Sequence, residues 1–150
     1  MLDRFETFTL LIDKIKRSIR RIKTEEMAEY DLKSPHVSCL YYLYKYNAQP
    51  LTAKELTEIC DEDKASVSRT VEYLVENGYL EDSKNGSKRY KTPLKLTRKG
   101  IDVAEGVVKK IDSVLAESSL GLTDAERDEM YRALATVSEN LQRICDKYGE

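Results

Sequence analysis

Several ingredients of common functional sites are scarce in this sequence. Its 150 residues include one histidine, no tryptophan, six glycines and three cysteines. A single histidine argues against a histidine-rich metal site, and no glycine-rich phosphate-binding loop is present. The cysteines, Cys39, Cys60 and Cys145, lie far apart and form no Cys-x-x-Cys motif. This pattern favours free thiols in a reducing compartment over a disulfide framework.

Long apolar stretches are lacking as well. A membrane-spanning helix needs about 20 consecutive, mostly apolar residues, and no stretch of the sequence approaches that length. Asp3, Arg4 and Glu6 near the start are unlike the first residues of a secretory signal. We therefore expect a cytoplasmic protein without a membrane partner. Because no nucleophile–base pair and no metal-ligand set emerges, we also expect neither an enzyme nor a bound cofactor.

Positive charge is concentrated in one short segment. The chain has 25 lysines and arginines against 27 acidic residues, a net charge of −2. Residues 83–100 hold seven cations and no acid, whereas residues 36–82 and 101–150 each have a net charge of −5. A short cationic segment suits phosphate groups. A second basic run, Lys14 to Lys23, fits either a solvated helix face, a phosphate contact or pairing with an acidic helix.

Both ends of the chain show the apolar spacing of long helices. Apolar residues recur there at alternating intervals of three and four, which gives a narrow seam of the kind that covers a partner helix. A single chain of this length offers little to cover two such seams, so we expect residues 1–33 and 101–150 to form a helical dimerisation region. The expected dimerisation residues are Phe5, Phe8, Ile12, Ile15, Leu134, Val137, Leu141 and Ile144.

Between these ends, residues 34–78 predict three shorter helices. Each predicted helix begins at a residue whose side chain can cap the first backbone N–H groups, and the third ends at Asn77-Gly78. The expected starts are Ser34 as N-cap with Pro35 following, Thr52 paired with Glu55 in a capping box, and Asp61 or Asp63.

A basic β-hairpin follows the third helix. Asn85-Gly86 is a strong turn signal between two runs of strand-forming residues. The returning strand, Tyr90 to Thr97, contains Pro93, and because proline has no N–H we expect it at the edge of the sheet. Thr97 can then cap a long helix. The predicted fold is mainly α, with a winged helix-turn-helix lobe at 34–100 made of a three-helix core and a β-hairpin wing.

This lobe predicts binding to double-stranded DNA. The major groove admits one helix, which is read from its exposed N-terminal face, and cations on a hairpin suit the negative minor groove. The expected contacts of the third helix are Lys64, Ala65, Ser66, Ser68, Arg69 and Thr70, and those of the wing are Lys84, Ser87, Lys88, Arg89 and Lys91. An alternative is a winged-helix interaction module that binds protein or RNA. Such a module would lack a steep salt dependence with duplex DNA and a two-fold symmetric footprint.

The order of motifs resembles the MarR family of bacterial winged-helix transcriptional regulators over almost the whole chain. The residues that carry the resemblance are Leu51-Thr52 with Glu55-Leu56, Asp63 to Arg69, Leu74 to Leu80, Leu94 to Thr97 with Gly100, and Leu122-Thr123 with Glu126. The resemblance implies a homodimer on pseudo-palindromic operators. It also implies a regulator, usually a repressor, that a small lipophilic or phenolic ligand releases from DNA. One departure is in the wing, where Lys88-Arg89-Tyr90 replaces the family's Asp-x-Arg pattern.

Tyrosines are crowded on the first of the three shorter helices. Tyrosine combines an apolar ring with a polar tip, as pockets for aromatic ligands require. His36, Cys39 and Tyr42 are therefore candidates for an effector pocket. The alternative for the tyrosines is packing in the core or the dimer seam or exposure to solvent, and the alternative for His36 is a structural role in the first turn of the helix.

Overall fold

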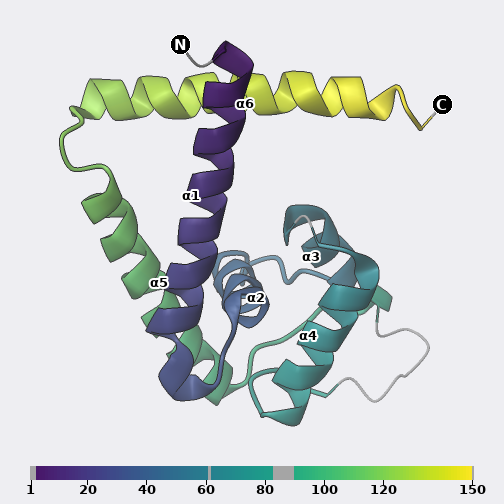
Figure 1. The fold of residues 1–150 in the computed structure, drawn as a ribbon. Helices are drawn as coiled ribbons and strands as arrows, with labels where there is room; N and C mark the ends of the chain where they lie inside the picture. The colour runs from purple at the N-terminus through teal and green to yellow at the C-terminus, as the bar shows by residue number, and fades with distance from the viewer. Residues whose placement is uncertain (1–2, 61, 83–89, 150) are drawn as a thin grey trace. The chain divides into compact units, whose positions relative to one another are not determined.

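A computed structural model describes residues 3–60, 62–82 and 90–149, and these residues are mainly helical, as predicted. The helices, in chain order, are α1 (Arg4–Glu26), the short 3-10 helix η1 (Ala28–Tyr30), α2 (Ser34–Lys45), α3 (Ala53–Cys60), α4 (Lys64–Glu76), α5 (Arg98–Ser118) and α6 (Asp124–Asp146) (Figure 1). The chain divides into two compact units, Met1–Ile111 and Asp112–Glu150.

Most of the predicted helix starts are confirmed by hydrogen bonds. The backbone N–H of Thr52 donates to Glu55 Oε2 at 2.8 Å, and that of Glu55 donates to Thr52 Oγ1 at 3.2 Å. The same reciprocal pair joins Thr123 and Glu126 before α6. Since each pair satisfies two N–H groups that a helix leaves without partners, these boundaries follow from local sequence.

The start of α2 differs from the prediction. Ser34 is the first helical residue and Lys33 precedes the helix, so Ser34 is not the N-cap. The Lys33 N–H donates to Nδ1 of His36 at 3.0 Å. The histidine ring thus accepts the hydrogen bond at the start of this helix, three residues after the N-cap position.

The segment that contains Pro93 is not at an edge, contrary to the prediction. Pro93 bridges Thr52 on one side, and Leu96 bridges Leu80 on the other. Leu94 N–H donates to the carbonyl of Leu51 at 2.8 Å, so the segment is paired through a neighbour of the proline. A proline whose missing N–H faces away from the bonded partner is tolerated there. The predicted Asn85-Gly86 turn lies outside the described residues.

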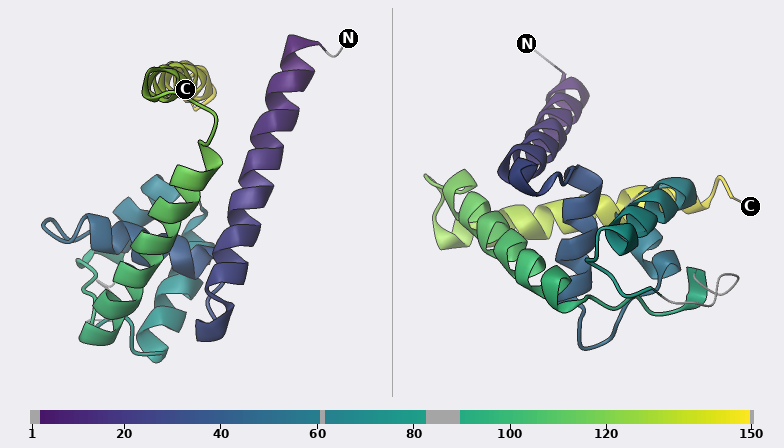
Figure 2. Two further views of the ribbon diagram at one scale, coloured as in Figure 1. Left: turned by 90° about the vertical axis from the view of Figure 1, so that its left-hand side faces the viewer. Right: turned by 90° about the horizontal axis from the view of Figure 1, so that it is seen from below.

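The core of the first unit lies where α2, α3 and α4 meet. These three helices lie together in all views (Figures 1 and 2). Leu40, Leu56 and Leu74, one from each helix, are 0% exposed. Each buried leucine contributes about 1.5–3 kcal/mol relative to an exposed one, so these side chains fix the position of α4. Ala104 and Val107 of α5 belong to the same cluster.

The start of α5 approaches this core so closely that a glycine is required. Gly100 is buried, and a Cβ added to it would lie 2.0 Å from the backbone oxygen of Tyr79. The Thr97 hydroxyl accepts from Gly100 N–H at 3.0 Å and donates to the carbonyl of Gly78 at 2.5 Å. These contacts join α5 to the residues that follow α4.

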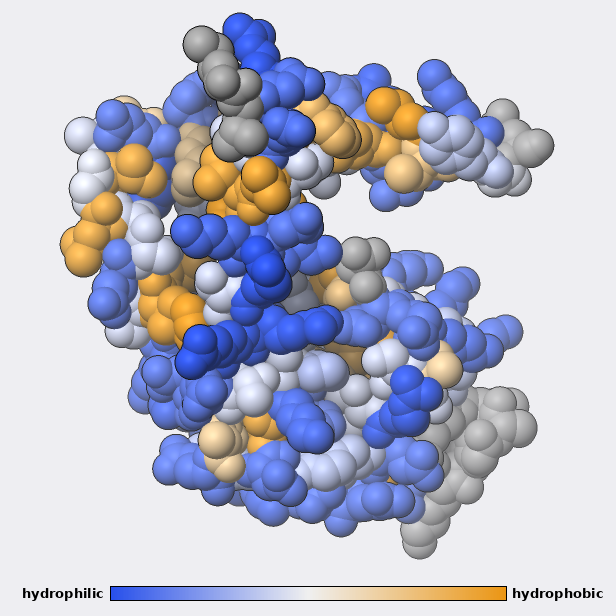
Figure 3. Space-filling model, in the orientation of Figure 1, coloured by the Kyte–Doolittle hydropathy of each residue, from blue (hydrophilic) through white to orange (hydrophobic). Residues whose placement is uncertain are grey.

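Helices α1 and α6 have no buried residues. The apolar seams predicted on them are present but uncovered, and Figure 3 shows apolar surface on both helices. Ile12 is half-buried. The other expected dimerisation residues are exposed: Phe5 at 71%, Phe8 at 39%, Ile15 at 52%, Leu134 at 40%, Val137 at 37%, Leu141 at 50% and Ile144 at 46%.

Candidate nucleic-acid interface

Helix α4 presents one polar face to solvent. Its N-cap is Asp63, whose Oδ1 accepts from the Ser66 N–H at 2.7 Å, which selects Asp63 from the two predicted caps. Val67 and Val71 turn inward and are 4% and 3% exposed. The remaining N-terminal residues therefore form the outer face. The exposed side chains there are Lys64, Ala65, Ser68 and Arg69.

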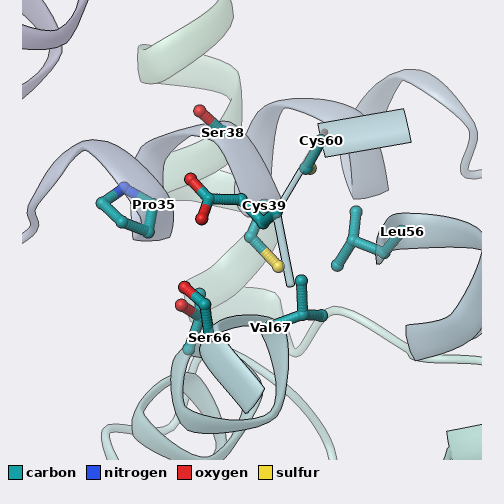
Figure 4. A pocket seen from close by; sticks show the side chains of 9 residues that line it. Pro35, Ser38, Cys39, Leu56, Cys60, Ser66 and Val67 are labelled. Atoms are coloured by element: carbon teal, nitrogen blue, oxygen red, sulfur yellow. The ribbon is translucent and has the colours of Figure 1, made fainter. Parts of the chain in front are cut away.

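Two residues of the predicted DNA-contact set lie on the other side of α4. Thr70 is 8% exposed and Ser66 is half-buried. Both line a small cavity between α2, α3 and α4 (Figure 4). Helical periodicity accounts for this, because Thr70 is three residues from Val67 and four from Leu74, on the stripe that packs inward. The outer face of α4 is consequently narrower than the predicted set.

The predicted wing contacts fall mostly outside the described residues. This holds for Lys84, Ser87, Lys88 and Arg89. Lys91 is described and exposed, as is Lys95, on the segment that leads back to α5. Both are close in sequence to the β-bridges that fix this segment beside the core.

Lys99 makes its contacts at the junction between α4 and α5. Its Nζ donates to the carbonyl of Asn77 at 2.8 Å and lies 4.4 Å from the ring centroid of Tyr79. A cation at the C-terminal end of a helix is favourable because the unpaired carbonyls there carry partial negative charge. This lysine therefore holds the end of α4.

The sequence analysis did not place Tyr90 among the DNA-contact residues, but in the structure Tyr90 lies beside the outer face of α4. The Lys64 Nζ lies 4.4 Å from the centroid of the Tyr90 ring. Lys64 opens α4, and Tyr90 is the first described residue after the predicted wing tip. In the sequence, the only indication of this contact is that an aromatic residue follows a basic run. That pattern is too common to predict which lysine the ring meets.

The three candidate effector residues have different neighbours. His36 stacks on Tyr73 of α4, with ring centroids 4.2 Å apart, and Tyr42 meets Tyr41 edge to face at 5.3 Å. Only Cys39 lines the cavity between α2, α3 and α4. The volume of this cavity, about 30 Å³, is close to that of one water molecule and far below the roughly 300–1,000 Å³ of ligand pockets. A phenolic ligand does not fit there.

The thiols beside this cavity are held in their protonated form. Burial raises the pKa of the Cys39 thiol above its ordinary value. Burial also raises the pKa of Cys60 to about 11, although the Lys23 ammonium nearby acts in the opposite direction. Because the thiolate is the reactive form, neither cysteine is activated for oxidation.

Neither a metal site nor a membrane span is found in the described part of the chain. No group of three or more histidine, cysteine, aspartate or glutamate residues could hold a metal ion among residues 3–60, 62–82 and 90–149. Within the same ranges, none of the helices has the length and apolar character needed to cross a membrane.

The three-helix core, the bridged segment after α4 and the exposed face of α4 define a winged helix-turn-helix protein. Residues 30–89 match the sequence model of the MarR family. A search of curated protein sequences finds no significant match. The resemblance to the MarR family predicted from the sequence is confirmed: residues 30–89 match the family, and the fold is that of MarR transcriptional regulators.

Several solved structures share this fold over nearly the full length of the chain. A MarR transcriptional regulator from Methanosarcina mazei Go1 is 21% identical, with 96% of this chain and 94% of that chain covered and a TM-score of 0.80. Staphylococcus aureus MepR in a DNA complex is 18% identical, with coverages of 93% and 99% and a TM-score of 0.79. A protein from Listeria monocytogenes described as a MarR family transcriptional regulator, complexed with a 26mer DNA, is 25% identical, with coverages of 94% and 90% and a TM-score of 0.76. Together these similarities show that the chain has the fold of MarR transcriptional regulators.

Proposed function

We propose that the protein is a homodimeric transcriptional repressor that binds pseudo-palindromic operators in duplex DNA. The observation that carries this proposal is the outer face of α4, where Lys64, Ser68 and Arg69 are exposed at the N-terminal end of a helix fixed by its buried side. Short polar groups and a guanidinium suit base edges and phosphates in the major groove. Repression is proposed from the family resemblance.

The uncovered faces of α1 and α6 support the homodimer. Phe5 and Ile15 on α1, and Leu134 and Leu141 on α6, are between 40% and 71% exposed. A regular row of such residues is characteristic of an interface between helices. Two copies related by a two-fold axis would present two α4 helices, whose half-sites are expected about 10 base pairs apart.

Release of the DNA by a small lipophilic or phenolic ligand is part of the proposal through the family resemblance alone. We place no such ligand in the cavity between α2, α3 and α4, because that space is too small. His36 and Tyr42 are occupied by aromatic neighbours within the first unit. A titration of candidate phenols against the DNA complex, followed by fluorescence anisotropy, tests this part separately.

Selection of bound duplexes from a random pool, followed by footprinting, tests the main proposal. We expect a two-fold symmetric footprint and an affinity that falls steeply with salt concentration. Arg69→Ala should weaken binding to the selected site, because it removes an exposed cation from the outer face of α4. Lys109→Ala removes an exposed cation from α5 and should leave the affinity unchanged.

Two outcomes would reject this function. A protein that retains no duplex, or binds it without symmetry or salt dependence, would instead favour the winged-helix module that contacts protein or RNA. Reporter expression from a promoter that carries the selected site then decides the direction of regulation: expression should rise when the protein is removed.

A further inference from the structure

The contact between Lys64 and Tyr90 joins the two parts of the candidate DNA-binding surface. Lys64 is the first residue of α4 and is exposed, with its Nζ 4.4 Å from the Tyr90 ring centroid. The two residues are 26 positions apart, so their meeting is a property of the tertiary fold. It connects the N-terminus of the recognition helix to the segment that returns from the predicted wing.

Tyr90 provides a fixed platform for the lysine. Its side chain is half-buried and packs against the core cluster that contains Leu40, Leu56 and Leu74. A few residues further on, Leu94 N–H is bonded to the carbonyl of Leu51. A ring anchored on one side by the core can hold a cation on its exposed side without moving toward it.

An aromatic partner leaves the positive charge of Lys64 available. A carboxylate would neutralise the ammonium, whereas a ring attracts it through its quadrupole and carries no net charge. The nearest carboxylate in sequence, that of Asp63, accepts the Ser66 N–H. A lysine in the first turn of a helix is disfavoured by the positive end of the helix dipole, and the contact with the Tyr90 ring acts against that cost.

We propose that Tyr90 is a positioning residue that holds the Lys64 ammonium where it binds a backbone phosphate of duplex DNA. The proposal rests on the proposed function and adds to it the role of one lysine and the residue that orients it. Tyr90 is also one of the two positions, with Lys88, at which the wing departs from the Asp-x-Arg pattern of the family it resembles. Lys64 thereby contributes to affinity for every sequence and does not select bases.

A double-mutant cycle on Lys64 and Tyr90 tests this assignment. The variants are Lys64→Met, Tyr90→Leu and the double substitution, compared with the wild type on the selected duplex and on an unrelated one. Lys64→Met should weaken binding to both duplexes by a similar factor and reduce the salt slope by about one. Tyr90→Leu should weaken binding about two- to fivefold in the wild type and have no effect when Lys64 is already methionine.

Two further variants separate positioning from other roles. Tyr90→Phe keeps the ring and removes the hydroxyl, so it should retain wild-type affinity and salt slope. Tyr41→Leu is the matched control, because the ammonium of Lys45 lies 5.6 Å from the Tyr41 ring centroid in a lysine–tyrosine pair within α2. We expect that substitution to leave DNA binding unchanged.

The contact itself is measured without DNA. The ε-methylene protons of Lys64 should be shifted upfield by the ring current in the wild type and in Tyr90→Phe, and this shift should disappear in Tyr90→Leu. Absence of the shift in the wild type overturns the proposal. So does an equal effect of Tyr90→Leu with and without Lys64, or a loss of affinity in Tyr90→Phe. Failure of the wild type to bind duplex DNA rejects the proposed function as well, whereas binding with an additive cycle rejects only the role of Tyr90.

Discussion

Helices α2 and α6 carry similar apolar rows but meet different surroundings. Leu40 on α2 is 0% exposed, whereas Leu134 on α6 is 40% exposed. The row on α2 is covered by α3, α4 and the start of α5 within the same chain. The rows on α6 and α1, by contrast, contain no buried residue.

This difference shows what an amphipathic pattern does and does not specify. The spacing of apolar residues identifies the face of a helix that is unfavourable in water. It does not identify the surface that covers that face. For α2 the cover comes from neighbouring helices of the chain, whereas for α1 and α6 we propose that it comes from a second copy.

The largest effect is expected for the exposed apolar row of α6. Leu134→Glu places a charge on the apolar row of α6, and in a symmetric dimer it acts twice. Burial of a leucine is favourable by about 1.5–3 kcal/mol, so two copies account for about 3–6 kcal/mol, or two to four powers of ten in the dimer dissociation constant. Sedimentation equilibrium measures this change.

The control for Leu134→Glu is Ala135→Glu, which puts the same charge on the neighbouring, exposed residue outside the apolar row. It should leave the dissociation constant close to that of the wild type. Equal sedimentation behaviour of Leu134→Glu and the wild type would show that α6 does not form the interface.

The buried apolar row of α2 is tested by Leu40→Ala. This substitution removes a side chain that is 0% exposed, and such changes cost about 2–5 kcal/mol in free energy of unfolding. Urea denaturation followed by circular dichroism measures the loss. Leu120→Ala, at a leucine that is 79% exposed, should change stability by less than about 0.5 kcal/mol. Equal losses for the two variants would contradict the described core.

A smaller effect is expected at the start of α4. Asp63→Ala removes the oxygen that accepts the Ser66 N–H, and loss of an N-cap costs about 0.5–2 kcal/mol. Asp63→Asn keeps a capping oxygen and should retain most of the stability in the same urea titration. If alanine and asparagine are equally stable, the cap does not contribute.

The smallest effect is a pH dependence from His36. Burial and the nearby Lys33 lower the pKa of this histidine, while Asp31 acts in the opposite direction. A histidine with a lowered pKa in the folded state binds its proton more readily when unfolded, so stability should fall as the pH is reduced below about 6.5. The proton would also remove the acceptor for the Lys33 N–H.

Unfolding free energies of the wild type and His36→Phe between pH 5 and 8 isolate this contribution. The phenyl ring keeps an aromatic surface against Tyr73 but does not titrate. The difference between the two proteins should therefore change with pH in the predicted direction. Parallel curves would remove His36 as the cause.

Sequence reasoning was most successful where the determinant was local. Thr52, Asp63, Thr97 and Thr123 cap the helices that they precede, because each cap depends on residues within one turn. The family resemblance rested on the order of such local motifs. At Pro93 the local rule led to the wrong expectation, because the pairing of neighbouring residues determines whether a missing N–H disrupts a sheet.

Properties that depend on contacts between distant residues were less accessible. His36, Cys39 and Tyr42 are regularly spaced on α2, yet each meets a different environment. The burial of Thr70 could have been predicted in part, since its spacing of three residues from Val67 and four from Leu74 in the sequence places it on the buried stripe of α4. The contact of Tyr90 with Lys64 is visible only in the folded chain.

The sequence alone therefore determined the helices, most of their starts, the cationic segment at 83–100 and the resemblance to the MarR family. These features depend on side chains a few positions apart, or on charge counted along the chain. The tertiary structure decided which polar residues of α4 face outward, which aromatic ring holds Lys64 and which apolar rows remain uncovered. Those outcomes depend on which surfaces meet after folding. A sequence pattern shows that a helix face is apolar, but it does not show which surface covers that face.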